Sequence, residues 1–442
     1  MMNRLNRLIL PPFDAILQSL RSSLAATLAT HAPLAGKLHY LADTGDVAIC
    51  RATGGDDDCG VRFVAAECDA DAHRLAGDED HDVVTFERLV PELDMSLLPA
   101  PVLAVQATRL AGGGVALGVS VHHGVADGRS LWRFIEAWAA VCRGDTPPAP
   151  PVFDRSRVNL PGGEELARSI LRKYVPDLPM VSGRPPPLVS LSLCLFPVWF
   201  SNISHALLDR HQARLRASLQ EDRLRFTRRT FTLDTQDTKR LKQRIVRLGE
   251  AHGAPLRRSP SSFVAVVALA WTCFVRGRAL AADDDDVFLF FFADARDRLD
   301  PPAGADYFGA CLTGCLARLP ARELHGEGAL AAAASAVQGA IEKMVEDPLG
   351  CWPGWEFFRF AGDPTLRLER FMNVSGSSGF RAYEVADFGW GRPRRTEPIR
   401  MNHDGQLALV RARDGDGVQA SVSMLQQKHV DAFKSEFLKL LG

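Results

Sequence analysis

The clearest pattern of apolar and polar positions lies between residues 102 and 142. Val102 to Thr108 is a short apolar run, which predicts a strand. After a glycine-rich turn, apolar residues alternate with small ones as far as Val121, and this period of two predicts a second strand. From Arg129 to Cys142 the apolar residues recur at helical spacing. Residues 122–128 are therefore a tight connection between a strand and a helix, where side chains are held rigidly beside a cleft.

Apolar patterning in the second half of the chain predicts further strands and helices. In chain order these are a strand at 230–233, a basic helix at 237–248, an apolar helix at 263–276, a buried strand at 287–292, a hairpin of strands at 406–412 and 418–425, and a closing amphipathic helix. Ser261 and Ser262 stand where a cap of the apolar helix is expected. The acidic residues 283–286 predict a solvated turn. Strands and helices mix throughout, so the predicted fold class is α/β.

The length of 442 residues implies two domains, because one hydrophobic core rarely grows that large. A proline-rich stretch at 145–162 marks the start of a crossover between them. We expect an N-terminal domain at 1–180, an atypical crossover at 181–225 and a C-terminal domain at 226–442. The apolar segment 185–222 lacks clean periodicity, so we interpret it as an insertion that exposes a hydrophobic patch. A membrane-touching loop is the alternative, although its flanking basic anchors are weak.

Composition and charge exclude several classes of protein function. A formal net charge of −1 argues against a nucleic-acid-binding protein, which carries a basic excess. The nine cysteines include no C-x-x-C pair, so neither a disulfide framework nor a zinc knuckle is predicted, and a cytoplasmic location fits. The most apolar stretch, 263–275, is shorter than the roughly 18 residues that a membrane span needs, and no targeting segment is evident. We therefore expect a soluble protein with neither a nucleic-acid nor a membrane partner.

The residue with the clearest chemical potential is His123. A histidine on a rigid strand-to-helix turn, with Gly124 and Gly128 beside it, can present an imidazole nitrogen to a cleft and act as a base. Asp127, four residues on, can fix the turn by pairing with a cation. The plain alternative is a pair of polar residues at a strand end, because a pattern as short as H-x-x-x-D recurs by chance. No metal site is predicted, since the adjacent His122 and His123 point to opposite faces at a strand end.

A second motif lies far downstream, at Asp387-Phe388-Gly389-Trp390-Gly391. Two glycines around a tryptophan predict a tight turn packed under an aromatic ring. The pair HHGVADG and DFGWG, in this order and near this separation, resembles the BAHD family of plant acyltransferases, which use acyl-CoA.

Three further segments agree with this resemblance. Residues 292–302 are similar to the family's D-x-R-x-R-L-x-P-P segment, residues 307–311 to its Y-F-G-N-C segment, and residues 33–38 to its P-L-A-G-x-L segment. The resemblance covers roughly residues 24–180 and 226–442.

The resemblance implies a fold and roles for three residues. The fold would be α/β, with two similar chloramphenicol-acetyltransferase-like domains, mixed sheets flanked by helices, and a channel between the domains. His123 would lie in the middle of the channel as general base, and Asp127 would point away from it and pair with Arg296 in a structural role. Asp387 is either a second acid/base group or part of the turn, and its glycine-rich neighbours favour the turn.

Acyl-CoA is the implied co-substrate, and no permanently bound cofactor is expected. Ser261 and Ser262 follow Arg257 and Arg258 at a helix N-terminus, where free N–H groups and positive charge can bind the phosphates of CoA. A plain serine cap is the alternative. Ser377, in the stretch N-V-S-G-S-S, is the candidate donor to the oxyanion.

The V-S-G-S variant of that stretch resembles the clade that acylates anthocyanins and other phenolic glycosides, often with malonyl-CoA. We expect a monomeric O-acyltransferase that moves a malonyl or hydroxycinnamoyl group from CoA to a hydroxyl of a phenolic or flavonoid glycoside. Compared with the family, the chain lacks the segment that precedes Leu10 in other members, so a first strand is expected to be missing. A catalytically impaired member that only binds ligands or partners is the alternative. A hydrolase in which His123 activates water has no supporting G-x-S-x-G motif.

Overall fold

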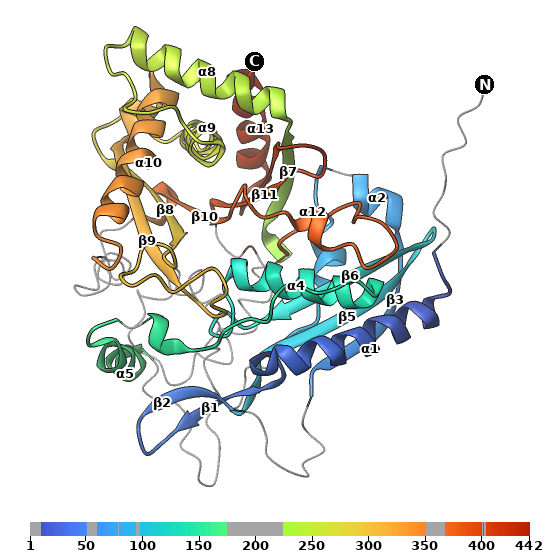
Figure 1. The fold of residues 1–442 in the computed structure, drawn as a ribbon. Coiled ribbons are helices and arrows are strands. Elements are labelled where there is room, and N and C mark those ends of the chain that lie inside the picture. Colours follow the sequence, from blue (N-terminus) through green and yellow to red (C-terminus); the bar gives the residue numbers. More distant parts are fainter. Residues whose placement is uncertain are drawn as a thin grey trace, which may run out of the picture.

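The structure is a computed structural model, whose ribbon is drawn in Figure 1. It describes residues 10–50, 60–77, 79–93, 98–158, 160–174, 224–350, 367–399, 401 and 404–442. The insertion predicted at 185–222 lies outside these residues, as does most of the predicted crossover.

The described part of the first half contains two three-stranded sheets, ordered β3-β5-β6 and β2-β1-β4. β3 and β5 are parallel, and the other neighbouring strands of these sheets are antiparallel. The strands are β1 (Lys37–Leu41), β2 (Asp46–Cys50), β3 (Arg62–Asp71), β4 (Ala100–Pro101), β5 (Leu103–Ala111) and β6 (Gly114–Val121). The helices are α1 (Phe13–Thr30), α2 (Ala72–Gly77), α3 (Val83–Arg88), α4 (Gly128–Arg143) and α5 (Gly163–Tyr174).

Helices α1 and α4 share one hydrophobic core with the β3-β5-β6 sheet, and Figure 1 shows them running beside it. Leu20 of α1, Val105 of β5 and Phe134 of α4 are all buried in this core. The indole N–H of Trp138 in α4 also donates to Oγ of Ser23 in α1, at 3.0 Å. The strand–strand–helix order predicted from the apolar pattern is therefore confirmed by β5, β6 and α4.

The described part of the second half builds one six-stranded sheet, ordered β7-β12-β11-β10-β8-β9. β10 is parallel to β11 and β8, and the other pairs are antiparallel. The strands are β7 (Thr227–Leu233), β8 (Asp286–Asp294), β9 (Leu312–Pro320), β10 (Phe371–Gly376), β11 (Gln406–Arg411) and β12 (Val418–Met424). The helices are α8 (Thr235–Ala251), α9 (Ser262–Gly277), α10 (Ala329–Glu346), α12 (Ala382–Val385) and α13 (Gln427–Leu441). Short 3₁₀ helices lie at Ala32–Ala35, Arg155–Val158, Ala321–Leu324 and Leu368–Arg370.

Helix α9 forms the centre of this second core. All its residues from Val264 to Val275 are buried, and it contacts α8, α10 and α13 (Figure 1). An apolar helix of this kind is stable because neighbouring elements bury every side of it. The predicted apolar helix, the hairpin of β11 and β12 and the closing helix are thus all confirmed.

The acidic loop before β8 is more than the solvated turn that was predicted. Both carboxylate oxygens of Asp283 accept hydrogen bonds from Arg370, at 3.0 and 2.7 Å. The partner lies far along the chain, just before β10, so the local charge run could not reveal it. The loop that precedes β8 is thus ion-paired to the residue that precedes β10, the neighbouring strand of the sheet.

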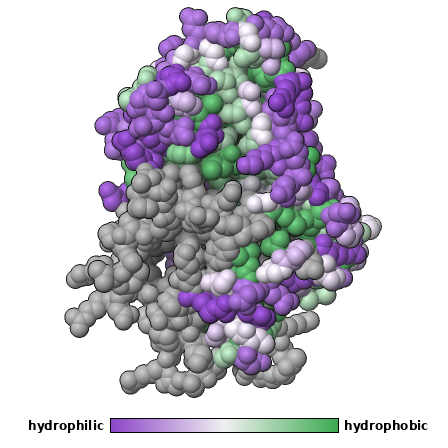
Figure 2. Space-filling model, turned by 90° about the vertical axis from the view of Figure 1, so that its left-hand side faces the viewer, coloured by the Kyte–Doolittle hydropathy of each residue, from purple (hydrophilic) through white to green (hydrophobic). Residues whose placement is uncertain are grey.

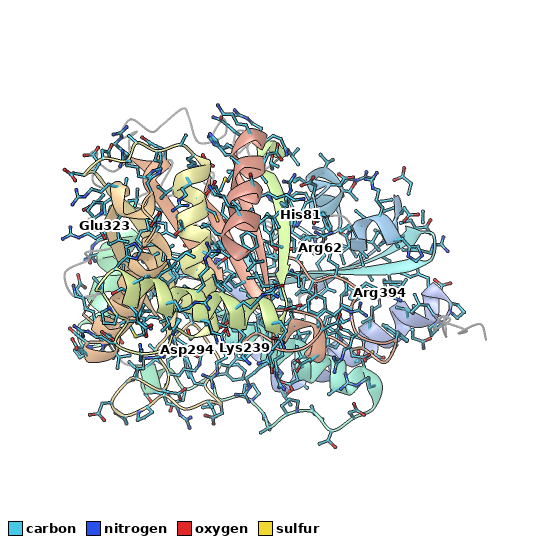
Figure 3. The ribbon with its side chains drawn as sticks, turned by 90° about the horizontal axis from the view of Figure 1, so that it is seen from above. Arg62, His81, Lys239, Asp294, Glu323 and Arg394 are labelled. Carbon is cyan, nitrogen blue, oxygen red and sulfur yellow. The ribbon has the colours of Figure 1, made fainter. Side chains whose placement is uncertain are left out.

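The segment 79–81 extends the six-stranded sheet at its β7 edge. Asp80 forms an antiparallel bridge with Arg229, and the His81 N–H donates to the Arg228 carbonyl at 3.0 Å. Figure 3 shows His81 next to strand β7. A piece of the first half is therefore joined to the sheet of the second half.

Figure 2 shows the face of the molecule that carries α10 and α5. Hydrophilic residues cover most of the upper part of this face, and hydrophobic residues gather towards its middle (Figure 2). Among the described residues, no helix combines the length and the apolar character that crossing a membrane requires.

Candidate active site

The connection between β6 and α4 carries the HHGVADG motif and is held by backbone hydrogen bonds on both sides. The His122 N–H donates to the Val102 carbonyl at 2.8 Å, and the Val125 N–H donates back to the His122 carbonyl at 3.0 Å. Helix α4 then begins after Asp127, whose Oδ1 accepts the Ser130 N–H at 2.9 Å as an N-cap. The motif is therefore a closed turn with a capped helix behind it.

Asp127 forms the ion pair that the resemblance implied. Its Oδ2 accepts Nη1 of Arg296 at 2.7 Å and the Cys311 N–H at 3.1 Å. Both charged side chains are completely buried. The pairing of Asp127 with Arg296 is thus confirmed, and it ties the turn to a loop of the second half.

The guanidinium of Arg296 uses all five of its N–H groups. Nη1 donates to Asp127 and to Asp294, Nη2 to Ser130 Oγ and to the Gly309 carbonyl, and Nε to the Tyr307 carbonyl. These bonds are 2.7 to 3.1 Å long. A buried charge is tolerated when its hydrogen-bonding capacity is filled in this way.

A second ion pair lies beside the first. Arg129, in the first turn of α4, donates to Asp294 at 2.8 Å, and Asp294 also pairs with Arg296 at 3.0 Å. Burial alone would raise the pKa of Asp294, but the hydrogen bonds and charges of these arginines lower that pKa overall. The start of α4 is thus held to the end of β8 by two arginines and two aspartates.

His123 is half-buried, whereas its neighbour His122 is only 4% exposed. Burial lowers the pKa of His123 below its ordinary value, and the Asp127 charge and a hydrogen bond to the Ala126 backbone only partly oppose that effect. The imidazole is therefore neutral at pH 7 and able to accept a proton. Among the described residues, no group of three side chains could hold a metal ion.

The loop after β10 carries Ser377 and lies against the motif. An added Cβ at Gly128 would come within 2.8 Å of the Phe380 ring, so that ring rests directly on the start of α4. Within the loop, Ser377 Oγ accepts the Gly379 N–H at 3.1 Å, and the Ser377 N–H donates to the Leu409 carbonyl at 2.9 Å. Because its oxygen is the acceptor, the Ser377 hydroxyl keeps its hydrogen for another partner.

Asp387 builds the turn in which it lies. Its Oδ1 accepts the N–H groups of Gly389 and Gly391, at 2.9 and 3.1 Å, and its carbonyl accepts a hydrogen bond from Arg143. Phe388 packs edge-on against Trp138 of α4, with ring centroids 4.9 Å apart. These contacts favour the turn over an acid/base role for Asp387.

Ser261, Ser262 and Arg258 lie at the start of α9. Ser261 is the N-cap, and its Oγ accepts the Val264 N–H at 3.2 Å, so the capping interpretation holds for this serine. Ser262 is the first residue of the helix, and the Arg258 side chain is exposed. In the described part of the chain, no hydrogen bond or ion pair joins these three residues to His123.

Several residues of the site were missed by sequence reasoning. They are Ser130, Arg129 and Phe380, which contact Arg296, Asp294 and Gly128 respectively. Ser130 stands three residues after an aspartate that precedes a helix, and this spacing could have identified it as part of the cap. For Arg129 and Phe380 the chain offers no local signal, because their partners are distant in sequence.

Three curated relatives are similar to most of the chain. The malonyl-CoA:anthocyanidin 5-O-glucoside-6''-O-malonyltransferase of Arabidopsis thaliana is 31% identical over 436 residues, covering 96% of this chain and 87% of the relative. Phenolic glucoside malonyltransferase 1 of Bemisia tabaci is 28% identical over 437 residues, covering 96% and 84%. The agmatine coumaroyltransferase of Arabidopsis thaliana is 29% identical over 387 residues, covering 86% and 78%.

Solved structures share the fold. Vinorine synthase matches with a TM-score of 0.64 at 22% identity, over 98% of this chain and 86% of that chain. TRI101 of F. sporotrichioides, complexed with coenzyme A and T-2, matches with a TM-score of 0.63 at 17% identity, over 97% and 91%. These matches confirm the predicted α/β fold class with mixed sheets flanked by helices.

Fold and relatives together define an enzyme that transfers an acyl group from acyl-CoA. The model of the Transferase family matches residues 11–440, so the chain belongs to this family, the BAHD acyltransferases. The family membership predicted from the HHGVADG and DFGWG motifs is therefore confirmed.

Proposed function

We propose that this enzyme moves a malonyl or hydroxycinnamoyl group from CoA to a hydroxyl of a phenolic or flavonoid glycoside, with His123 as general base. The observation that carries the proposal is a half-buried, neutral histidine on a turn that the buried Asp127–Arg296 pair holds in place. By their names, two of the relatives transfer malonyl groups to glucosides and a third transfers a coumaroyl group.

The proposed reaction begins when an acceptor hydroxyl lies beside His123. The unprotonated ring nitrogen takes the hydroxyl proton while the oxygen attacks the thioester carbonyl of acyl-CoA. The Ser377 hydroxyl donates to the oxyanion of the tetrahedral intermediate. When the intermediate collapses, the C–S bond breaks and the CoA thiolate takes the proton back from His123. Asp127 and Asp387 hold the surrounding turns and do not exchange protons.

CoA is proposed to bind at the start of α9. Ser262, the exposed Arg258 and the free N–H groups of the first helical turn would face its phosphates. We also propose that the units 1–180 and 226–442 supply His123 and this CoA site respectively. We also propose that the protein is a cytoplasmic monomer.

The test is a transfer assay with purified protein, malonyl-CoA or coumaroyl-CoA, and a flavonoid glucoside. We expect release of CoA thiol and a product heavier by one acyl group, with both lost in a His123→Ala variant. Ligand-dependent thermal stabilisation without turnover would instead support the impaired, binding-only alternative. Turnover by His123→Ala equal to that of the unaltered enzyme would contradict the base assignment.

A further inference from the structure

His122 immediately precedes the proposed base and is the more buried of the two histidines. Its side chain is 4% exposed, whereas His123 is half-buried. Both residues follow the end of β6 at Val121 and lie in the turn that leads to α4. A buried imidazole needs hydrogen-bond partners, whereas an apolar side chain of similar size would not.

The His122 ring makes a hydrogen bond across its own turn. Its Nδ1 accepts the Gly124 N–H at 3.0 Å. A backbone N–H can only donate, so Nδ1 carries no proton and the proton of the neutral ring lies on Nε2. Only the neutral form with the proton on Nε2 can make this bond.

The absence of a side chain at Gly124 leaves room for the His122 ring. An added Cβ would lie 2.9 Å from Nδ1 of His122, closer than real Cβ atoms approach, and 3.1 Å from Cε1, a tight contact. The glycine therefore allows the imidazole to lie flat against the backbone. A methyl group at this position would push the ring away and lengthen the hydrogen bond.

These contacts fix the backbone on both sides of His123. Before it, the His122 N–H is bonded to the Val102 carbonyl at 2.8 Å. After it, the Gly124 N–H is bonded to the His122 ring, and the Val125 N–H to the His122 carbonyl at 3.0 Å. The direction of the His123 side chain follows from this backbone, and displacement of a reacting group by about 1 Å can cost on the order of 100-fold in rate.

We propose that His122 is a positioning residue, which holds the turn through its Nδ1 acceptor so that His123 meets the acceptor hydroxyl. The inference rests on the proposed function of His123 and deepens it. In this role His122 acts through the backbone of the turn and exchanges no proton with the substrate.

Asparagine and leucine separate this role from simple packing. The side-chain carbonyl of Asn accepts the N–H two residues further on, the same bond that His122 makes. Leu fills a comparable volume but offers no acceptor. We expect His122→Asn to keep kcat within about threefold, and His122→Leu to lower kcat by about 10- to 100-fold, with KM for acyl-CoA within twofold in both.

A second pair of variants tests the contact without removing the ring. Gly124→Ala should lower kcat as His122→Leu does, because the new Cβ displaces the imidazole. In a His122→Ala background there is neither a ring to displace nor a hydrogen bond to lose, so the same Gly124→Ala change should cost less than threefold in kcat. This loss of the Gly124→Ala effect is expected even if His122→Leu folds poorly, and thermal melts of every variant report the folded fraction.

The outcomes separate the two proposals. Equal losses of kcat in His122→Asn and His122→Leu, or an unchanged kcat in His122→Leu, would overturn the positioning role. Additive effects of Gly124→Ala and His122→Ala would overturn it too. Full activity of His123→Ala would instead remove the proposed base, whatever the His122 variants do.

Discussion

Asp127 has no oxygen left for proton transfer. Oδ1 caps helix α4 through the Ser130 N–H, and Oδ2 is shared by Arg296 and the Cys311 N–H. The residue sets the start of the helix and compensates a buried cation at the same time. At the residue scale, the HHGVADG motif thus contains one proposed reactive group, His123. Its other polar side chains hold the turn in which His123 lies.

Loss of the Asp127 charge should destabilise the protein. Asp127→Asn would leave the guanidinium of Arg296 buried with one opposing charge fewer, and we expect the free energy of unfolding to fall by about 3–5 kcal/mol. Urea denaturation measures the change. The control is Asp297→Asn, an exposed residue 3.6 Å from Arg129, whose loss should cost less than about 1 kcal/mol. Similar losses in the two variants would contradict the importance of the buried pair.

Asp387 can be tested for chemistry with an isosteric change. Asn keeps an oxygen that accepts the Gly389 and Gly391 N–H groups, so Asp387→Asn should retain kcat within about threefold if the residue only builds the turn. A general acid or base replaced in this way would lose about 100- to 10,000-fold. Steady-state kinetics of the variant, beside Asp387→Ala as the turn-breaking control, decides between the two readings.

The pH dependence of kcat/KM reports on His123. Only the neutral imidazole accepts a proton, and burial lowers its pKa from the ordinary 6.5. The rate should therefore rise with pH along an acid limb whose midpoint lies below 6.5, and then level off. A pH–rate profile with a stability control at each pH measures this. A midpoint above 6.5 would argue that another group limits the reaction.

At the scale of elements, the start of α9 combines a cap with exposed positive charge. The Arg258 backbone carbonyl is anchored by the Gln338 side-chain amide at 3.0 Å, which leaves its guanidinium to reach into solvent. Arg257 is also exposed, but it pairs with Glu342 at 3.2 Å. Both arginines are exposed, so Arg257 can serve as the control for Arg258, which is the proposed CoA contact.

Removal of the Arg258 charge should weaken acyl-CoA binding. We expect Arg258→Ala to raise KM for acyl-CoA by about fivefold or more while kcat stays within twofold, because a phosphate contact acts equally on ground and transition states. Arg257→Ala should change KM by less than twofold. Measuring both KM values at low and high salt adds a second check, since screening should shrink the difference. Equal changes of KM in the two variants would contradict the proposed CoA site at the start of α9.

At the scale of the whole molecule, the two halves meet again at the β7 edge of the large sheet, far along the chain from the catalytic motif. The side chain of Glu397 is buried there. It accepts hydrogen bonds from Thr230 and Ser421, both at 2.7 Å, and from Arg395 at 3.0 Å, and His81 lies 3.5 Å away. His81 comes from the first half and Thr230 and Ser421 from strands of the second. The carboxylate therefore joins three separate segments of the chain.

This junction should make stability sensitive to acid. Burial alone would raise the pKa of Glu397, but its bonds with His81, Arg395 and Thr230 lower the pKa overall. A carboxyl whose pKa is lowered by folding stabilises the protein above its unfolded pKa of about 4.3, and this contribution is lost as pH falls through the folded value. We expect Glu397→Gln to lower the free energy of unfolding at pH 7 by about 2–4 kcal/mol.

Urea denaturation of both proteins from pH 7 to pH 3 checks this expectation. The difference between Glu397→Gln and the unaltered protein should shrink as the carboxyl of the latter becomes protonated. An exposed control, Glu67→Gln, should follow the unaltered protein at every pH. A difference that stays constant down to pH 3 would mean that the charge of Glu397 does not stabilise the junction.

The elements of the fold were largely determined by the sequence itself. The period-two run in β6 and the apolar face of α4 are properties of consecutive residues, and so is the uniformly apolar α9. The HHGVADG and DFGWG motifs indicated the family, and the resemblance to this family implied the pairing of Asp127 with Arg296. Local patterning suffices for such features because each residue contributes to a periodicity that its neighbours share.

Contacts between distant segments were decided only by the tertiary structure. The junction around Glu397, the anchoring of Asp283 by Arg370 and the packing of Phe380 on Gly128 join residues whose neighbours show no pattern. The Nδ1 bond of His122 is local, yet it too depends on a backbone shape that the surrounding sheet imposes. Packing in three dimensions excludes water, so each buried polar group must find a hydrogen-bond partner within the protein. Which partner it finds depends on the segments that pack around it, and the pattern of residues along the chain does not contain that information.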